Sequence, residues 1–247
     1  MSFLWLRNKD KLIIDSPDNM EKAAEYYGIL PFFLNKVRGL SVQELCAPGM
    51  LFGGNLEEGC WEWKGPVIRR KTSAYGKFFN RKAGFVSMEL LPDFLNYRRA
   101  LLEVKPASTE ELLLEIIMEN GDITSTELKS YIFGRPQSRR KADEIPDNNF
   151  REMHPSPKRK SLEGPLQRLQ MGGHIIISDF EYKTTKRGER YGWGVARYST
   201  PEYHFGELLR LPENKTPEES LEDIVSYVKK RYTRLWSDKL LRSILKP

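Results

Sequence analysis

The spacing of apolar residues predicts short helices and short strands that alternate along most of the chain. Residues 109–121, TEELLLEIIMENG, place leucines and isoleucines on one helical face and end at a glycine. A second short helix is expected at 123–134 and a third at 161–173, because apolar residues recur there at helical spacing. Residues 175–198 hold two β-prone runs that flank a charged tip, which predicts a β-hairpin.

The rest of the chain carries the same mixture of elements. The segment 73–87, SAYGKFFNRKAGFVS, is rich in aromatic residues and breaks at NRKAG, which predicts a second hairpin. Ser41 and Glu44 have the spacing of a capping box at the start of a short helix. Further helices are expected at 18–28, 92–103, 216–236 and 237–246.

The order of elements between residues 107 and 200 is helix, short helix, helix, strand, basic loop and strand. This is the succession of a winged helix-turn-helix domain, so the predicted fold class is α+β with a winged helix. We expect three regions: an N-terminal α+β region at 1–105, the winged-helix domain at 106–205 and C-terminal helices at 206–247. Residues 135–160 are proline-rich, polar and aperiodic, which predicts a loop or a disordered insertion between the second and third helices.

Composition and charge narrow the class of protein. The chain has 247 residues, of which 39% are hydrophobic and 11% aromatic, enough for a packed core. Its net charge of +6 permits a polyanionic partner without requiring one. The insertion holds eight basic and four acidic residues and therefore carries +4 of that charge. Cys46 and Cys60 are too few for a disulfide framework or a zinc site, and we expect them to be buried free thiols.

Several classes of protein find no support in the sequence. The N-terminal MSFLWLRNKDK has no long apolar run after a basic start, and no stretch approaches the ~20 apolar residues of a membrane span. A cytoplasmic protein that does not contact the membrane is therefore expected. His154, His174 and His204 are scattered, and the chain has no zinc, nucleotide-binding or serine-hydrolase motif, so no metal and no cofactor are expected.

DNA is the expected partner of a winged-helix domain with a basic wing. Lysines and arginines on a hairpin tip can neutralise phosphates, and side chains on the third helix can reach base edges. The candidates on the third helix are Gln167, Arg168 and Gln170, and those on the wing are Lys183, Lys186, Arg187 and Arg190. The candidates in the insertion are Arg139, Arg140, Lys141, Lys158, Arg159 and Lys160. The plainer interpretation is a solvated turn and surface glutamines, and winged helices also serve as protein–protein modules.

The segment CWEWK at 60–64 alternates two tryptophans with two charged residues. A strand would place Trp61 and Trp63 on one face and both charges on the other. Burial in the core is the favoured interpretation, because large aromatic residues dominate core packing. The alternative is a platform that stacks an unpaired base, with Glu62 as an acid or base. That pocket would be lined by Trp61, Glu62, Trp63, Arg69, Arg70, Tyr75 and Lys77.

Five segments carry a resemblance to a known family: WEWKGP, AYGKFFNRKAGFVS, DFLNYRR, LQRLQMGGHIIISDF and YGWGVARYSTPE. Together they resemble bacterial proteins of the AlkZ-related family, which are distantly similar to the AlkZ/YcaQ winged-helix DNA glycosylases. The resemblance implies a DNA-binding protein of tandem winged-helix units, with a diverged unit in the N-terminal half. Those glycosylases excise alkylated or crosslinked bases without a metal and carry a Gln-x-Gln or Gln-x-Asp motif. None of Gln43, Gln137, Gln167 and Gln170 begins such a motif, so no catalytic residue is carried over.

Three functions follow from these observations. The first is a DNA-binding winged-helix protein linked to DNA repair, which binds duplex DNA through its third helix and its basic wing. The second is a divergent glycosylase-like enzyme that acts on damaged bases. The third is a protein–protein adaptor on a winged-helix scaffold.

Overall fold

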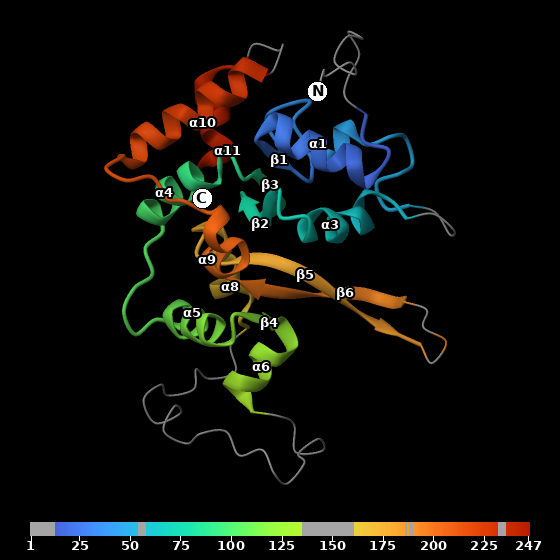
Figure 1. Cartoon of the computed structure of the whole chain (residues 1–247), viewed down its shortest axis with the longest axis vertical. Helices are drawn as coiled ribbons and strands as arrows, with labels where there is room; N and C mark the ends of the chain where they lie inside the picture. Colours follow the sequence, from blue (N-terminus) through green and yellow to red (C-terminus); the bar gives the residue numbers. More distant parts are fainter. Residues whose placement is uncertain (1–12, 54–57, 135–160, 186, 188–189, 232–235) are drawn as a thin grey trace.

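The computed structural model describes residues 13–53, 58–134, 161–185, 187, 190–231 and 236–247. It has the mixed α+β architecture predicted from the sequence, with helices around two small antiparallel sheets (Figure 1). The buried apolar residues form one continuous cluster that runs through both sheets and the surrounding helices. No helix within the described ranges is long and apolar enough to cross a membrane.

The N-terminal part of the chain builds the first sheet and the helices around it, which we call the first unit. Its third strand lies between the other two, so the sheet order is β1-β3-β2 and both pairs are antiparallel. The helix at the start is capped by the Ser16 hydroxyl and ends at Gly28, whose φ of 74° suits glycine. The elements are α1 (Pro17–Tyr27), β1 (Ile29–Pro31), α2 (Val42–Leu45), α3 (Cys60–Arg69), β2 (Ser73–Phe79) and β3 (Lys82–Ser87).

The hairpin predicted at 73–87 is confirmed, and its two strands are joined by a tight turn at Asn80 and Arg81. Asn80 and Arg81 both have positive φ, 47° and 65°, and Phe79 pairs with Lys82 across the turn. Two central residues with positive φ give the tight turn whose twist matches that of the strands.

A second set of six elements, the second unit, repeats the order of the first. After α4 (Leu91–Leu101), the described residues again form helix, strand, helix, helix, strand and strand. The sheet order β4-β6-β5 again places the third strand in the middle of an antiparallel sheet. The elements are α5 (Thr109–Asn120), β4 (Asp122–Thr124), α6 (Ser125–Phe133), α8 (Glu163–Met171), β5 (Ile176–Thr184) and β6 (Arg190–Ser199). The predicted helices and hairpin of this part are therefore confirmed, and the insertion 135–160 lies outside the described residues.

The two units pack against each other reciprocally. The last helix of the first unit, α3, lies against β5, and the last helix of the second unit, α8, lies against β2. The first strands of the two hairpins, β2 and β5, also contact each other. At their contact, the rings of Tyr75 and Phe180 are 6.1 Å apart in an edge-to-face arrangement. Each unit thus covers the third helix of the other with its own hairpin.

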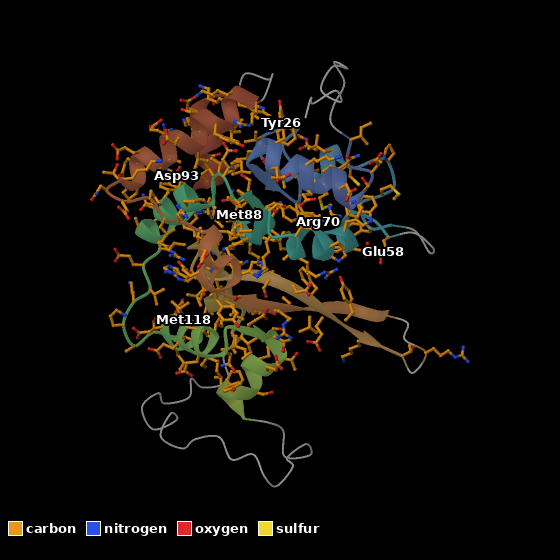
Figure 2. All side chains as sticks on the ribbon, in the orientation of Figure 1. Tyr26, Glu58, Arg70, Met88, Asp93 and Met118 are labelled. Carbon is orange, nitrogen blue, oxygen red and sulfur yellow. The ribbon has the colours of Figure 1, made fainter. Side chains whose placement is uncertain are left out.

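The C-terminal helices α10 and α11 pack on the first unit on the side away from the second sheet, whereas α9 lies next to the second sheet (Figure 1). Asp93, on α4, faces the long helix α10 (Figure 2) and accepts hydrogen bonds from Lys215 Nζ at 2.5 Å and Ser220 Oγ at 2.8 Å. The elements are α9 (Pro201–Phe205), the 3-10 helix η3 (Gly206–Leu208), α10 (Pro217–Arg231) and α11 (Asp238–Leu245).

The strand considered for the two tryptophans is wrong, because this segment is the helix α3. The reason lies at its N-terminus, where the Gly59 amide donates to Glu62 Oε2 at 3.1 Å. This half of a capping box satisfies a backbone donor that the helix leaves open, which favours a helical start at this point. The alternation of apolar and charged residues covers only four positions, 61–64, which is too short to specify a strand.

Candidate functional site

A groove lies between α3 of the first unit and the β5–β6 hairpin of the second. Its volume is about 460 Å³. Four consecutive residues of β5 line it, although neighbouring residues of a regular strand point to opposite faces. The pairing of β5 with β6 is regular from Asp179 to Glu181, and register shifts lie on either side, between Ile177 and Asp179 and between Glu181 and Lys183. The lining residues are Arg69, Asp179, Phe180, Glu181, Tyr182 and Arg197.

The charges in the groove compensate one another. Arg69 Nη1 lies 2.8 Å from Asp179 Oδ1. Arg197 bridges two carboxylates, with Nη1 at 3.0 Å from Glu181 and Nε at 2.8 Å from Asp122. The groove is therefore close to neutral, and Phe180 and Tyr182 give it an aromatic surface. Such a surface suits a flat ring better than a phosphate.

A buried lysine adjoins the groove. Lys64, on α3, is 2% exposed, and its Nζ lies 3.9 Å from the centroid of the Trp61 ring and 4.5 Å from that of Phe180. The ammonium donates to the Trp61 carbonyl oxygen and forms no ion pair with a described carboxylate. Burial lowers the pKa of Lys64 to about 8, although the nearby Glu62 carboxylate acts in the opposite direction.

Aromatic side chains continue from this lysine toward the surface. The Trp61 ring is 6.0 Å from the ring of Phe52, which is 57% exposed. In the groove, the Tyr182 ring lies over Gly194, where a Cβ atom would come within 2.9 Å of it. We call Phe52, Trp61, Phe180 and Tyr182 the aromatic strip. It connects the exposed end of α3 with the groove.

The residues expected to form a base-stacking pocket are separated in the structure. Trp63 and Tyr75 are 6% and 2% exposed, so their interpretation as core residues is confirmed. Burial also raises the pKa of Tyr75 well above its usual value. Glu62 caps α3, so its carboxylate already serves a structural contact. Of the expected set, Trp61 and Arg69 lie along the aromatic strip and the groove.

Arg70 and Lys77 lie outside that groove. Arg70 follows the last turn of α3 (Figure 2), and its guanidinium binds the carboxylates of Asp18 and Glu21 on α1. The backbone amide of Lys77, on β2, donates to Gln170 Oε1 at 3.0 Å. Both residues therefore hold elements of the fold together.

The predicted base-reading residues of α8 face the first unit. Gln170 is 1% exposed, accepts from the Lys77 amide and donates to the Leu166 carbonyl at 3.2 Å. Gln167 Nε2 donates to the Arg81 carbonyl in the β2–β3 turn at 3.2 Å. A contact between either amide and a base edge would require that side chain to leave the contact between the units.

The other predicted DNA contacts lie at the surface or outside the described residues. Arg168 is exposed and its Nε lies 3.2 Å from Glu110. Lys183 and Arg187 are exposed at the end of the hairpin, which extends away from the body of the molecule (Figure 1). Arg190 is the first residue of β6. Lys186 and the insertion candidates Arg139, Arg140, Lys141, Lys158, Arg159 and Lys160 lie outside the described residues.

A second cavity of about 260 Å³ lies where α8 meets the segment between α4 and α5. His174 borders it, and its Nε2 is 2.7 Å from the Leu102 carbonyl oxygen. Burial lowers the pKa of His174. The ion pair of Arg168 and Glu110 lies at the same cavity.

The sequence interpretation missed Lys64 and the groove residues of β5. Lys64 could have been found by treating 60–69 as a helix, because Cys60, Val67 and Ile68 on its buried face surround that position. The groove residues of β5 become a site only where β5 packs against α3, so no comparable local pattern in the sequence marks them. Among the described residues, no group of three His, Cys, Asp or Glu side chains could hold a metal ion.

Comparisons with known proteins give one family and one similar structure. A family model described as AlkZ related matches residues 14–246. No curated protein matches the chain. The structure of the Streptomyces sahachiroi DNA glycosylase AlkZ is similar with a TM-score of 0.45 and 12% sequence identity. The similarity covers 87% of this chain and 51% of the glycosylase, so the chain spans about half the length of that protein.

Proposed function

Because the chain belongs to the AlkZ-related family, we propose that it binds duplex DNA in connection with DNA repair, through two winged-helix units in tandem. The observation that carries the proposal is the repeated order of elements. Both units run helix, strand, helix, helix, strand, strand, and in both sheets the last strand is central. This is the succession expected of a winged helix, whose final hairpin is the wing.

The wing of the second unit is the main contact in this proposal. Lys183 and Arg187 are exposed near its tip, and neither forms an ion pair with another described residue. Most other arginines of the structure are paired with carboxylates, as in the groove. Free cations on a projecting hairpin can replace the counterions of phosphates with little demand on geometry.

In this proposal the third helices, α3 and α8, contribute less to DNA binding than the third helix of a single winged-helix domain does. The hairpin of the other unit covers part of each helix, and Gln170 is buried in that contact. Arg168 is the exposed cation on α8. The proposal therefore predicts binding that depends on phosphate contacts more than on base sequence.

The test is a salt series on charge variants. Binding to a fluorescent duplex is followed by anisotropy for the unchanged chain, for Lys183→Ala/Arg187→Ala and for the control Lys230→Ala/Lys239→Ala. The control residues are exposed cations on α10 and α11. Loss of two phosphate contacts should reduce the slope of log affinity against log salt by about 1.8. Equal slopes for the wing variant and the unchanged chain would overturn the role of the wing.

A second candidate function is an enzyme that accepts a damaged base. The near-neutral groove and the aromatic strip favour it, because a base turned out of the duplex needs aromatic surfaces for stacking. Glu62 was the expected acid or base, and Glu62→Gln keeps an oxygen that can still cap α3. Release of a damaged base that persists unchanged in this variant would remove Glu62 from the chemistry. The adaptor function remains the third candidate, and it predicts no binding of nucleic acid above background.

A further inference from the structure

The buried amine beside the groove has a chemical use that the fold does not require. We propose that Lys64 is an amine nucleophile that captures the aldehyde of an abasic sugar placed in the groove between α3 and β5. The inference rests on the proposed function, because it takes damaged DNA as the ligand. In DNA, the ring-opened sugar of an abasic site carries an aldehyde with which an amine can condense.

The surroundings of Lys64 set it apart from the other lysines of the structure. Its Nζ lies between two aromatic rings, Trp61 and Phe180, instead of beside a carboxylate. Lys215 and Lys229, in contrast, form ion pairs at 2.5 Å and 2.6 Å. Burial disfavours the charged form of this amine, and no described carboxylate forms an ion pair with it to offset that cost.

The protonation of Lys64 follows from this position. Its pKa is lowered to about 8 by burial, against the opposing effect of Glu62. About a quarter of the side chain would then be neutral near pH 7.5, compared with about one in a thousand for an ordinary lysine. A desolvated lysine with a lowered pKa is a recognised form of activated nucleophile. The amine therefore has the electron pair that condensation requires.

Phe180 controls the route between the groove and the amine. Its half-buried ring borders both the groove and the ammonium, whereas Lys64 is itself 2% exposed. The proposal therefore requires the Phe180 ring to move aside before an aldehyde in the groove can reach Nζ. The groove volume of about 460 Å³ is within the range of small-molecule sites and can hold one sugar with its ring open.

The amine and the aldehyde condense to an imine in two steps. The neutral Nζ of Lys64 adds to C1′ of the aldehyde, and the carbonyl oxygen takes up a proton to form a carbinolamine. Loss of that hydroxyl as water, together with the second hydrogen on Nζ, leaves a carbon–nitrogen double bond. The reaction consumes one amine and one aldehyde, releases one water and is reversible. Borohydride reduces the imine to a stable secondary amine, which makes the linkage detectable.

The first measurement tests the amine without DNA. The full chain is treated with a small aldehyde and cyanoborohydride, and the modified lysines are identified by peptide mass spectrometry. We expect Phe180→Ala to increase modification of Lys64 at least several-fold and to leave the exposed Lys22 unchanged. No increase at Lys64 in a folded Phe180→Ala variant would overturn the role of the ring and of the route.

The second measurement tests the abasic site. An abasic duplex is incubated with the full chain and borohydride, and the covalent complex is separated under denaturing conditions. We expect a complex with the unchanged chain and with the control Lys22→Met, and at least a tenfold loss with both Lys64→Met and Lys64→Arg. A complex that survives in both Lys64 variants, or its absence from an unchanged chain that binds the duplex, would overturn the proposal. Non-covalent binding to the same duplex is measured in parallel, so failure to bind DNA at all is recognised as failure of the proposed function.

Discussion

Lys64→Met should change how the stability of the protein depends on pH. The substitution keeps the length of the side chain and removes the charge that lies between Trp61 and Phe180. In the folded chain the pKa of Lys64 is lowered from 10.5 to about 8. Below about pH 8 both the folded and the unfolded chain hold the proton, so the folded state bears the full cost of the buried charge.

The magnitude follows from the two pKa values. The difference between about 8 in the folded chain and 10.5 in the unfolded chain corresponds to about 3.4 kcal/mol. As pH rises through this window, the folded chain releases the proton first, so its free energy of unfolding increases. Between about pH 7 and about pH 10, Lys64 should contribute a gain of about 2.5 kcal/mol that Lys64→Met lacks.

Urea unfolding of both chains, followed by tryptophan fluorescence at the two pH values, measures this effect. All other titrating groups are shared, so the difference between the chains isolates Lys64. The same experiment on Lys22→Met, which removes an exposed lysine of α1, is the matched control. A difference between the unchanged chain and Lys64→Met that stays constant with pH would refute the reasoning.

Three further predictions concern buried polar groups. Gln170→Leu should lower the free energy of unfolding by about 1–3 kcal/mol, because the Lys77 amide loses its hydrogen-bond acceptor. Urea unfolding measures this change, and an unchanged midpoint of the urea transition would contradict the contact between the units. Cys46 and Cys60, with Sγ atoms 2.7 Å apart and pKa values raised by burial, should form a disulfide slowly under diamide. Closing this loop should stabilise the chain by about 3 kcal/mol, and two thiols still free by maleimide counting would count against it. Arg98→Met should leave stability unchanged or raise it by up to about 2 kcal/mol, because Nε and Nη1 of this buried arginine have no hydrogen-bond partner among the described residues and burial lowers its pKa to about 10. A melting temperature that falls by several degrees would show that the charge is needed.

Local signals in the sequence were sufficient to predict most of the helices and both hairpins. Ser41 caps α2 by accepting from the Glu44 amide, and its hydroxyl donates to the Glu44 carboxylate, while Gly121 ends α5 with a φ of 69°. The turn of the first hairpin falls at Asn80 and Arg81, within the predicted NRKAG. Caps, glycines with positive φ and tight turns depend on neighbouring residues, so a single sequence is enough to identify them.

The candidate site could not be predicted in the same way, because it depends on contacts between the two units. Lys64 and Phe180 lie 116 positions apart in the chain and meet only when α3 packs against β5. Gln170 is a polar residue of the kind expected at the surface. Its side-chain oxygen instead accepts a hydrogen bond from the Lys77 backbone amide of the other unit. Tertiary packing decides these positions, and no local pattern specifies which unit covers which helix.

The most direct test of DNA binding by this chain is a comparison of two fluorescent duplexes across a salt series. One duplex is intact, and the other carries a single stable analogue of an abasic site. Binding that weakens steeply with salt and is tighter for the duplex with the lesion is the predicted result. No binding to either duplex at low salt would contradict the account and leave the adaptor function.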